Sequence, residues 1–70
     1  MLQITHPGRP YEIVVRGRLT QRLDFDDLIV RARPGETSLT GCFADQAQLF
    51  GALMRLRDLG IELISVNALD

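Results

Sequence analysis

Apolar and polar residues alternate along residues 11–19, which read YEIVVRGRL. One face of this segment carries Tyr11, Ile13, Val15, Gly17 and Leu19. The other face carries Glu12, Val14, Arg16 and Arg18. Because successive side chains of a strand point to opposite faces, the pattern predicts a strand with one face in a core.

Two further extended segments follow, residues 28–33 (LIVRAR) and residues 37–43 (TSLTGCF). Their inward positions are Leu28, Val30, Ala32, Leu39 and Phe43. The outward positions of the first are Ile29, Arg31 and Arg33. Pro34-Gly35-Glu36 separates the two segments, and this run is typical of a tight turn in which glycine takes a positive φ. The two segments therefore predict an antiparallel hairpin.

Residues 45–59 follow helical spacing instead. Asp45 is suited to cap the helix N-terminus, and Gln48 stands three residues later at the capping-box position. The apolar stripe that follows consists of Leu49, Ala52, Leu53, Leu56 and Leu59. Gly60 predicts a left-handed stop, with Ile61 folding back onto the last turn. A second flank of the helix carries Ala47, Phe50 and Met54 and offers a further contact surface.

Residues 61–69 (IELISVNAL) predict the last strand, which is apolar on both faces and is therefore expected to be covered on both. The order of elements is β-β-β-α-β, an α+β fold in which one helix covers one face of a four-stranded, mainly antiparallel sheet. We expect the first three strands to form a meander and the last strand to lie beside the first. Residues 1–70 form one small domain, in which residues 1–10 are a proline-containing arm or edge.

Part of this pattern resembles a known sequence pattern. It runs from Leu39-Thr40-Gly41 through Asp45-Gln46-Ala47, Leu49, Gly51 and Leu53 to the segment RDLGIELISV at residues 57–66. It is similar to that of small uncharacterised bacterial proteins of the form LTG…DQAxLxGxLxxLRDLGxxLISV. The resemblance covers under half of the chain and implies a short stand-alone protein with no assigned activity. Those proteins often carry His-Gly where this chain has Phe50-Gly51, so a role of that histidine does not carry over.

Size and composition narrow the classes of function. The chain has 70 residues, a length near the lower limit for a domain that folds without disulfides or metal. Hydrophobic residues make up 46% of it, as is ordinary for a globular protein. No apolar run approaches the roughly 20 residues needed to span a bilayer, and no signal-peptide pattern is visible. We therefore expect a cytoplasmic protein with no membrane partner.

Residues with reactive side chains are few. His6 is the single histidine and lacks the partners that a catalytic base or a metal site needs. Asp24, Asp26 and Asp27 lack the glycine and the distal glutamate of a calcium loop. Cys42, the single cysteine, has no histidine nearby in the sequence to act as its base. The sequence predicts no catalytic residue, no metal site and no cofactor, and a protein that is not an enzyme.

All eight basic residues are arginines, although the net charge is −1. If the first two strands are neighbours, one sheet face gathers Arg16, Arg18, Arg31 and Arg33. Such a patch would bind phosphate groups or a nucleic-acid backbone. The stacking aromatic residues of sheet-based RNA-binding proteins are missing from these strands, and Glu12 and Glu62 are placed to pair with the arginines. Anion or nucleic-acid binding is therefore the alternative hypothesis.

The sheet face away from the helix is also expected to carry apolar residues. The predicted interface residues are Val14, Ile29, Ile64 and Val66. Apolar residues mixed with arginines are typical of protein interfaces, and a single helix covers only one face of such a sheet. The first hypothesis is a non-enzymatic interaction module that binds a second copy of itself, as a homodimer through this face, or another protein.

Overall fold

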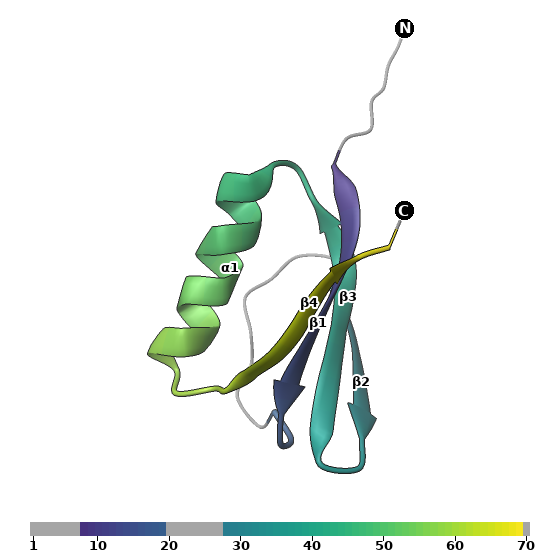
Figure 1. The fold of residues 1–70 in the computed structure, drawn as a ribbon, viewed down its shortest axis with the longest axis vertical. Helices are drawn as coiled ribbons and strands as arrows, with labels where there is room; N and C mark the ends of the chain where they lie inside the picture. Colours follow the sequence, from purple (N-terminus) through teal and green to yellow (C-terminus); the bar gives the residue numbers. More distant parts are fainter. Residues whose placement is uncertain (1–7, 20–27, 70) are drawn as a thin grey trace, which may run out of the picture.

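The computed structural model describes residues 8–19 and 28–69 (Figure 1). Its elements along the chain are β1 (Arg9–Arg16), β2 (Ile29–Arg33), β3 (Glu36–Phe43), α1 (Gln46–Asp58) and β4 (Leu63–Ala68). This order confirms the predicted α+β fold, with the helix on one side of a single open sheet. β1 begins inside the segment predicted as an arm. Pro10 is tolerated there because it lies at the beginning of the strand, where its carbonyl still accepts from the Leu69 amide at 2.9 Å.

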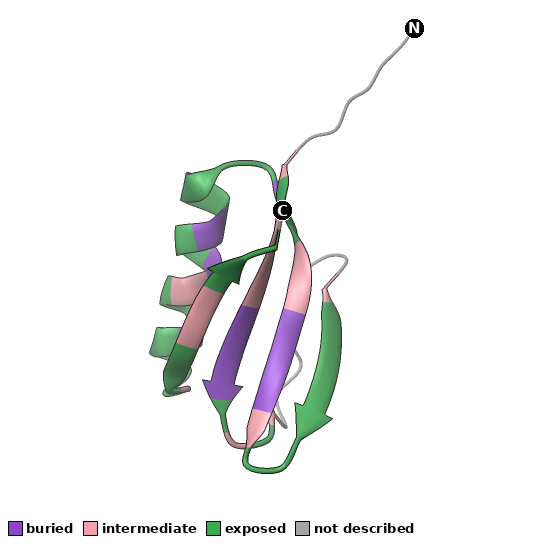
Figure 2. Cartoon of the chain, turned by 45° about the vertical axis from the view of Figure 1, so that its right-hand side comes forward, coloured by how far each residue is buried: buried purple, intermediate pink, exposed green. Residues whose placement is uncertain are grey.

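The strands lie in the order β2-β3-β1-β4, and every neighbouring pair is antiparallel. The predicted hairpin of β2 with β3 and the predicted place of β4 beside β1 are both confirmed. The predicted meander is wrong, because β3 rather than β2 lies beside β1. The reason is visible in Figure 2: β3 is buried along its middle on both faces, whereas all of β2 is exposed. A strand buried on both faces belongs inside a sheet.

The turn between β2 and β3 also joins the hairpin to β1. Pro34 precedes Gly35, whose φ of 77° is the positive value that a type II turn needs at its third position. The Gly35 carbonyl accepts from the Gly17 amide at 2.8 Å, and the Thr37 hydroxyl donates to the Gly17 carbonyl at 2.7 Å. Gly17 itself has φ 83° and open space where a Cβ would stand. Its role is therefore the backbone bend that ends β1.

Helix α1 begins and ends where the sequence predicts. The Asp45 carboxylate accepts from the Gln48 amide at 2.8 Å, and the Gln48 side chain accepts from the Ala44 amide. At the other end Gly60, with φ 79°, donates to the Arg57 carbonyl, and Ile61 donates to the Leu56 carbonyl. These two bonds complete a Schellman motif.

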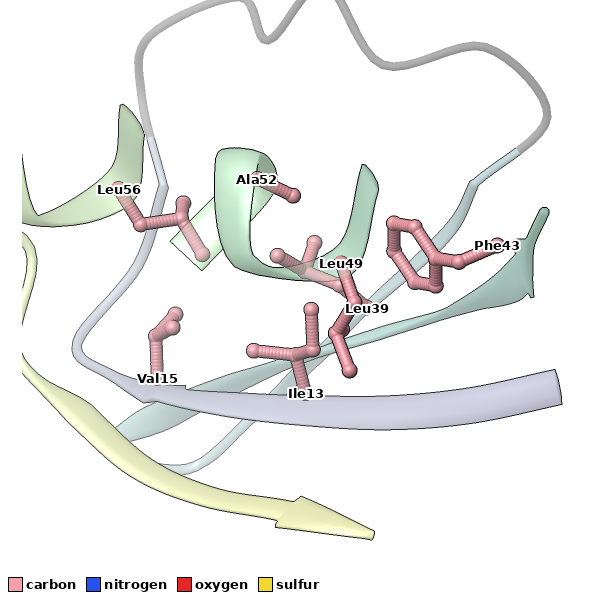
Figure 3. Close-up of a cluster of buried hydrophobic side chains, with 7 residues drawn as sticks. All are labelled: Ile13, Val15, Leu39, Phe43, Leu49, Ala52 and Leu56. Carbon is pink, nitrogen blue, oxygen red and sulfur yellow. The ribbon is translucent and has the colours of Figure 1, made fainter. Parts of the chain in front are cut away.

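The core lies between α1 and the two central strands (Figure 3). Its buried members are Ile13, Val15, Leu39, Phe43, Leu49, Ala52 and Leu56. Leu53 is half-buried against this cluster, whereas Leu59 is 41% exposed because it is the C-cap and has left the buried stripe. Burying one large aliphatic side chain stabilises a fold by about 1.5–3 kcal/mol, so within the described part of the chain these side chains are a main source of stability.

Candidate functional site

The sheet face away from α1, called the open face below, carries a charged cluster across three strands. The Glu12 carboxylate accepts from the Ser38 hydroxyl at 2.8 Å and from the Arg33 guanidinium at 3.2 Å. A second nitrogen of Arg33 lies 3.4 Å from the Glu36 carboxylate. Ser38 is only 1% exposed, and the Glu12 side chain is 23% exposed. The centre of the open face is therefore occupied by polar groups that bind one another.

This cluster explains the burial of Val14, which is 6% exposed although it lies outside the core cluster. Val14 stands opposite Ser38 in the β1–β3 pairing, and Arg33 stands opposite Glu36 one row further along. To reach Glu12 the Arg33 side chain has to cross the row that holds Ser38 and Val14. The methylene stem of an arginine can cover apolar surface in this way while its charged end stays in solvent.

A second ion pair links the end of β1 to the residue just before β4. The Arg16 guanidinium lies 3.1 Å from the Glu62 carboxylate, and both side chains are more than half exposed. The expected pairing of Glu12 and Glu62 with arginines is confirmed. Exposed pairs of this kind contribute little to stability, but they neutralise the charge of both partners.

The four arginines of the predicted anion patch are separated by this arrangement. β3 lies between the strands that carry Arg16 and Arg31, so the condition for a continuous patch is not met. Arg16 and Arg33 bind carboxylates, and Arg31 lies opposite Ser38 on the open face. Arg18 follows the end of β1 and lines a hollow of about 510 Å³ beside the β2–β3 turn.

The predicted interface residues do not share one surface. Ile29 does lie exposed on the open face, opposite Thr40, whereas Val14 is buried there. Val66 stands opposite the core residue Ile13 and packs against the core, so its expected place on the open face is wrong. The register of β1 with β4 shifts at Val14 and Val15, which leaves Ile64 at the irregularity, 41% exposed. Through this shift Val66, opposite Ile13, and Leu63, opposite Val15, both stand on the core face of the sheet.

Apolar side chains gather instead on the helix side of the sheet, between α1 and β4. We define the α1–β4 apolar surface as Phe50, Leu53, Met54, Ile61 and Leu63. With Leu56 and Arg57 these residues line a hollow of about 620 Å³. Phe50, Met54 and Leu63 are 55%, 53% and 46% exposed. The helix flank of Phe50 and Met54 was visible in the sequence, but its continuation onto β4 depends on the crossover that brings Leu63 beside it.

A contiguous apolar hollow on a small protein is typical of an interaction site. Among the described residues its lining has one charged member, Arg57, whose guanidinium lies 3.7 Å from the Asp58 carboxylate. Because the lining offers almost no hydrogen-bonding side chains, it suits another apolar surface better than a polar ligand.

The other sequence candidates add no second site. Cys42 is exposed on β3, while His6, Asp24, Asp26 and Asp27 lie outside the described residues. Within residues 8–19 and 28–69, no three histidine, cysteine or acidic side chains are grouped to hold a metal ion. Over the same ranges no helix has the length and apolar character to cross a membrane.

Comparison with known proteins gives a family and no activity. A family model described as a domain of unknown function, DUF8691, matches residues 10–67. The matched range begins at the second residue of β1 and ends one residue before the end of β4, so it contains the residues of the open-face cluster and of the α1–β4 apolar surface. No curated protein and no solved structure matches the chain.

Proposed function

The chain belongs to this DUF8691 family, and from its surfaces we propose that it is a small non-enzymatic interaction module that associates with a second copy of itself. The observation that supports the proposal is the α1–β4 apolar surface, where three large side chains are each about half exposed around one hollow. A cytoplasmic location, expected from the sequence alone, is part of the same proposal.

This proposal moves the contact away from the open face. Of the predicted open-face residues, Ile29 is an exposed apolar side chain on that face, while Val14 is covered and Val66 lies on the other side. The centre of the open face is filled by the Glu12–Arg33–Ser38 cluster, whose groups would have to be desolvated in a sheet-to-sheet contact. The α1–β4 apolar surface carries no such cost.

A second copy also has a thermodynamic reason to bind. Among the described residues the buried cluster has seven members, and a domain of this size supplies roughly 3–5 kcal/mol of net stability. Association through exposed apolar groups next to the core adds stability to the folded state by mass action.

Sedimentation equilibrium of the wild-type protein over a range of concentrations tests the proposal. We expect a monomer–dimer equilibrium that Phe50→Asp and Met54→Asp each weaken by at least tenfold. Ile29→Asp is the matched control, because Ile29 is 57% exposed, close to the exposure of Phe50, but lies on the open face. A wild-type protein that stays monomeric throughout would overturn the proposal. Loss of the dimer in Ile29→Asp alone would return the contact to the open face.

Anion or nucleic-acid binding through Arg16, Arg18, Arg31 and Arg33 stays a prediction that no comparison tests. The carboxylates beside Arg16 and Arg33 compete with a phosphate for the same donors, so this hypothesis is less well supported than self-association. Fluorescence anisotropy with pooled oligonucleotides at low salt decides it. Binding that weakens steeply with added salt would support it, and no binding at low salt would end it.

A further inference from the structure

The two outer strands of the sheet differ in how their free edges are protected. β2 (IVRAR) carries two arginines and is followed by Pro34, which are features that discourage pairing with another strand. β4 (LISVNA) carries no charged residue and no proline, yet it is equally an outer strand (Figure 2). Edge strands without such protection readily pair with another chain.

The hydrogen bonds at the end of β4 define which of its backbone groups face outward. Leu69 donates to Pro10 at 2.9 Å, so in the regular register that follows, Asn67 and Ser65 direct their backbone groups towards β1. Val66 and Ala68 alternate with them and direct their N–H and C=O groups away from β1. No other described strand lies on that side.

An antiparallel contact between two β4 strands fits this edge. A two-fold axis perpendicular to the sheet, close to Val66, sets the outward groups of one copy opposite those of the other. The axis keeps both helices on the same side of the joined sheet. The α1–β4 apolar surfaces of the two copies then flank the line where the strands meet. No like charges oppose one another among residues 63–68, because this segment is uncharged.

We propose that the chain forms a homodimer by antiparallel pairing of β4 with β4 of a second copy, giving one continuous eight-stranded sheet with both helices on one side. The inference rests on the proposed self-association and specifies its geometry. The second copy supplies the backbone partners that Val66 and Ala68 lack among the described strands, and it supplies the apolar surface that covers Phe50, Met54 and Leu63.

The expected affinity follows from the area available. Phe50, Met54 and Leu63 expose about half of their surface, so two copies would cover on the order of 600 Å² of apolar side chain in addition to the strand edges. A standard protein interface buries about 1,600 Å² in total, so this contact falls at the small end. We expect a dissociation constant in the micromolar range.

Amide hydrogen exchange of the unmodified protein tests the geometry directly. Measured above and below the dissociation constant, exchange at Val66 and Ala68 should slow by at least tenfold in the dimer. The Val30 amide is the matched control. It points away from β3 on the β2 edge, by the alternation that starts at the Arg33–Glu36 pair. Its exchange should not change with concentration.

Proline substitution supplies the second measurement. Val66→Pro removes an outward N–H, and Ala68→Pro does so at a position with less packing to lose. Each should weaken the dimer at least tenfold, while Val30→Pro on the other edge leaves it unchanged. Circular dichroism confirms that each variant is folded. Ala68→Pro decides the comparison if Val66→Pro does not fold.

The possible failures are distinguishable. A wild-type protein that never associates overturns the proposed function together with this inference. A wild-type dimer that Phe50→Asp disrupts, with equal exchange at Val66 and Ala68 in monomer and dimer, overturns strand pairing alone. In that case the two copies would meet through the helix flank.

Discussion

The Glu12 carboxylate is predicted to contribute more to stability than any other charged group on the sheet. Glu12 and Glu62 each pair with an arginine across strands, at 3.2 Å and 3.1 Å. The two pairs differ in exposure: the Glu12 side chain is 23% exposed and that of Glu62 is 64% exposed. Glu12→Ala and Glu62→Ala therefore form a matched comparison of a partly buried and an exposed pair.

The expected magnitude comes from the groups that Glu12 leaves behind. In Glu12→Ala the Ser38 hydroxyl, which is 1% exposed, loses its acceptor, and an unsatisfied buried donor costs about 1–3 kcal/mol. Glu62→Ala breaks only an exposed pair, which is worth about 0–1 kcal/mol. Against a total of roughly 3–5 kcal/mol for a core of this size, the first change removes a large share of the stability and the second does not.

Urea unfolding followed by circular dichroism, at one fixed protein concentration, measures both free energies. The double variant Glu12→Ala/Ser38→Ala isolates the bond itself. We expect a coupling energy of about 0.5 kcal/mol or more, because removing both partners leaves no unsatisfied donor. A Glu12→Ala variant no less stable than Glu62→Ala, or additive effects in the double variant, would refute the reasoning.

Three further predictions concern the helix and the dimer. Leu56→Ala, at a side chain 2% exposed, should cost about 2–5 kcal/mol in urea unfolding, while Leu59→Ala, 41% exposed, should cost much less. Asp45→Ala should cost about 1 kcal/mol in the same assay, with Asp45→Asn largely preserving the cap. The thermal midpoint of the wild-type protein should rise with protein concentration, whereas that of Phe50→Asp should stay constant.

The helix could be predicted from the sequence because its determinants are local. Asp45, Gln48 and Gly60 act within one turn of their own positions, so a single sequence defines both ends of α1. The β2–β3 hairpin is equally local, since Pro34 and Gly35 are enough to reverse the chain. The α+β class followed from these two units together with the alternation of β1.

The strand order could not be predicted in the same way, because it depends on contacts distant in sequence. β1 pairs with β3 through residues such as Val14 and Ser38. In the sequence alone each of these two residues has the pattern of an outward-facing surface position. Ser38 is buried, and its hydroxyl donates to the Glu12 carboxylate that Arg33 also reaches from the neighbouring strand. An outward valine and a serine give no sign of this in a sequence read one segment at a time.

The strand order β2-β3-β1-β4, which differs from the predicted meander, also determines where we expect association. With β3 inside the sheet, the arginines of β2 lie at one outer edge and the uncharged β4 forms the other. Helix α1 leads directly into β4, so Phe50 and Met54 stand beside the edge that lacks protection. Head-to-tail pairing of different edges would propagate indefinitely, whereas the proposed two-fold contact would use the β4 edge of both copies and, among the described strands, leave the two arginine-bearing β2 edges outside. In the proposed dimer the same asymmetry would therefore favour pairing at β4 and limit it to two copies.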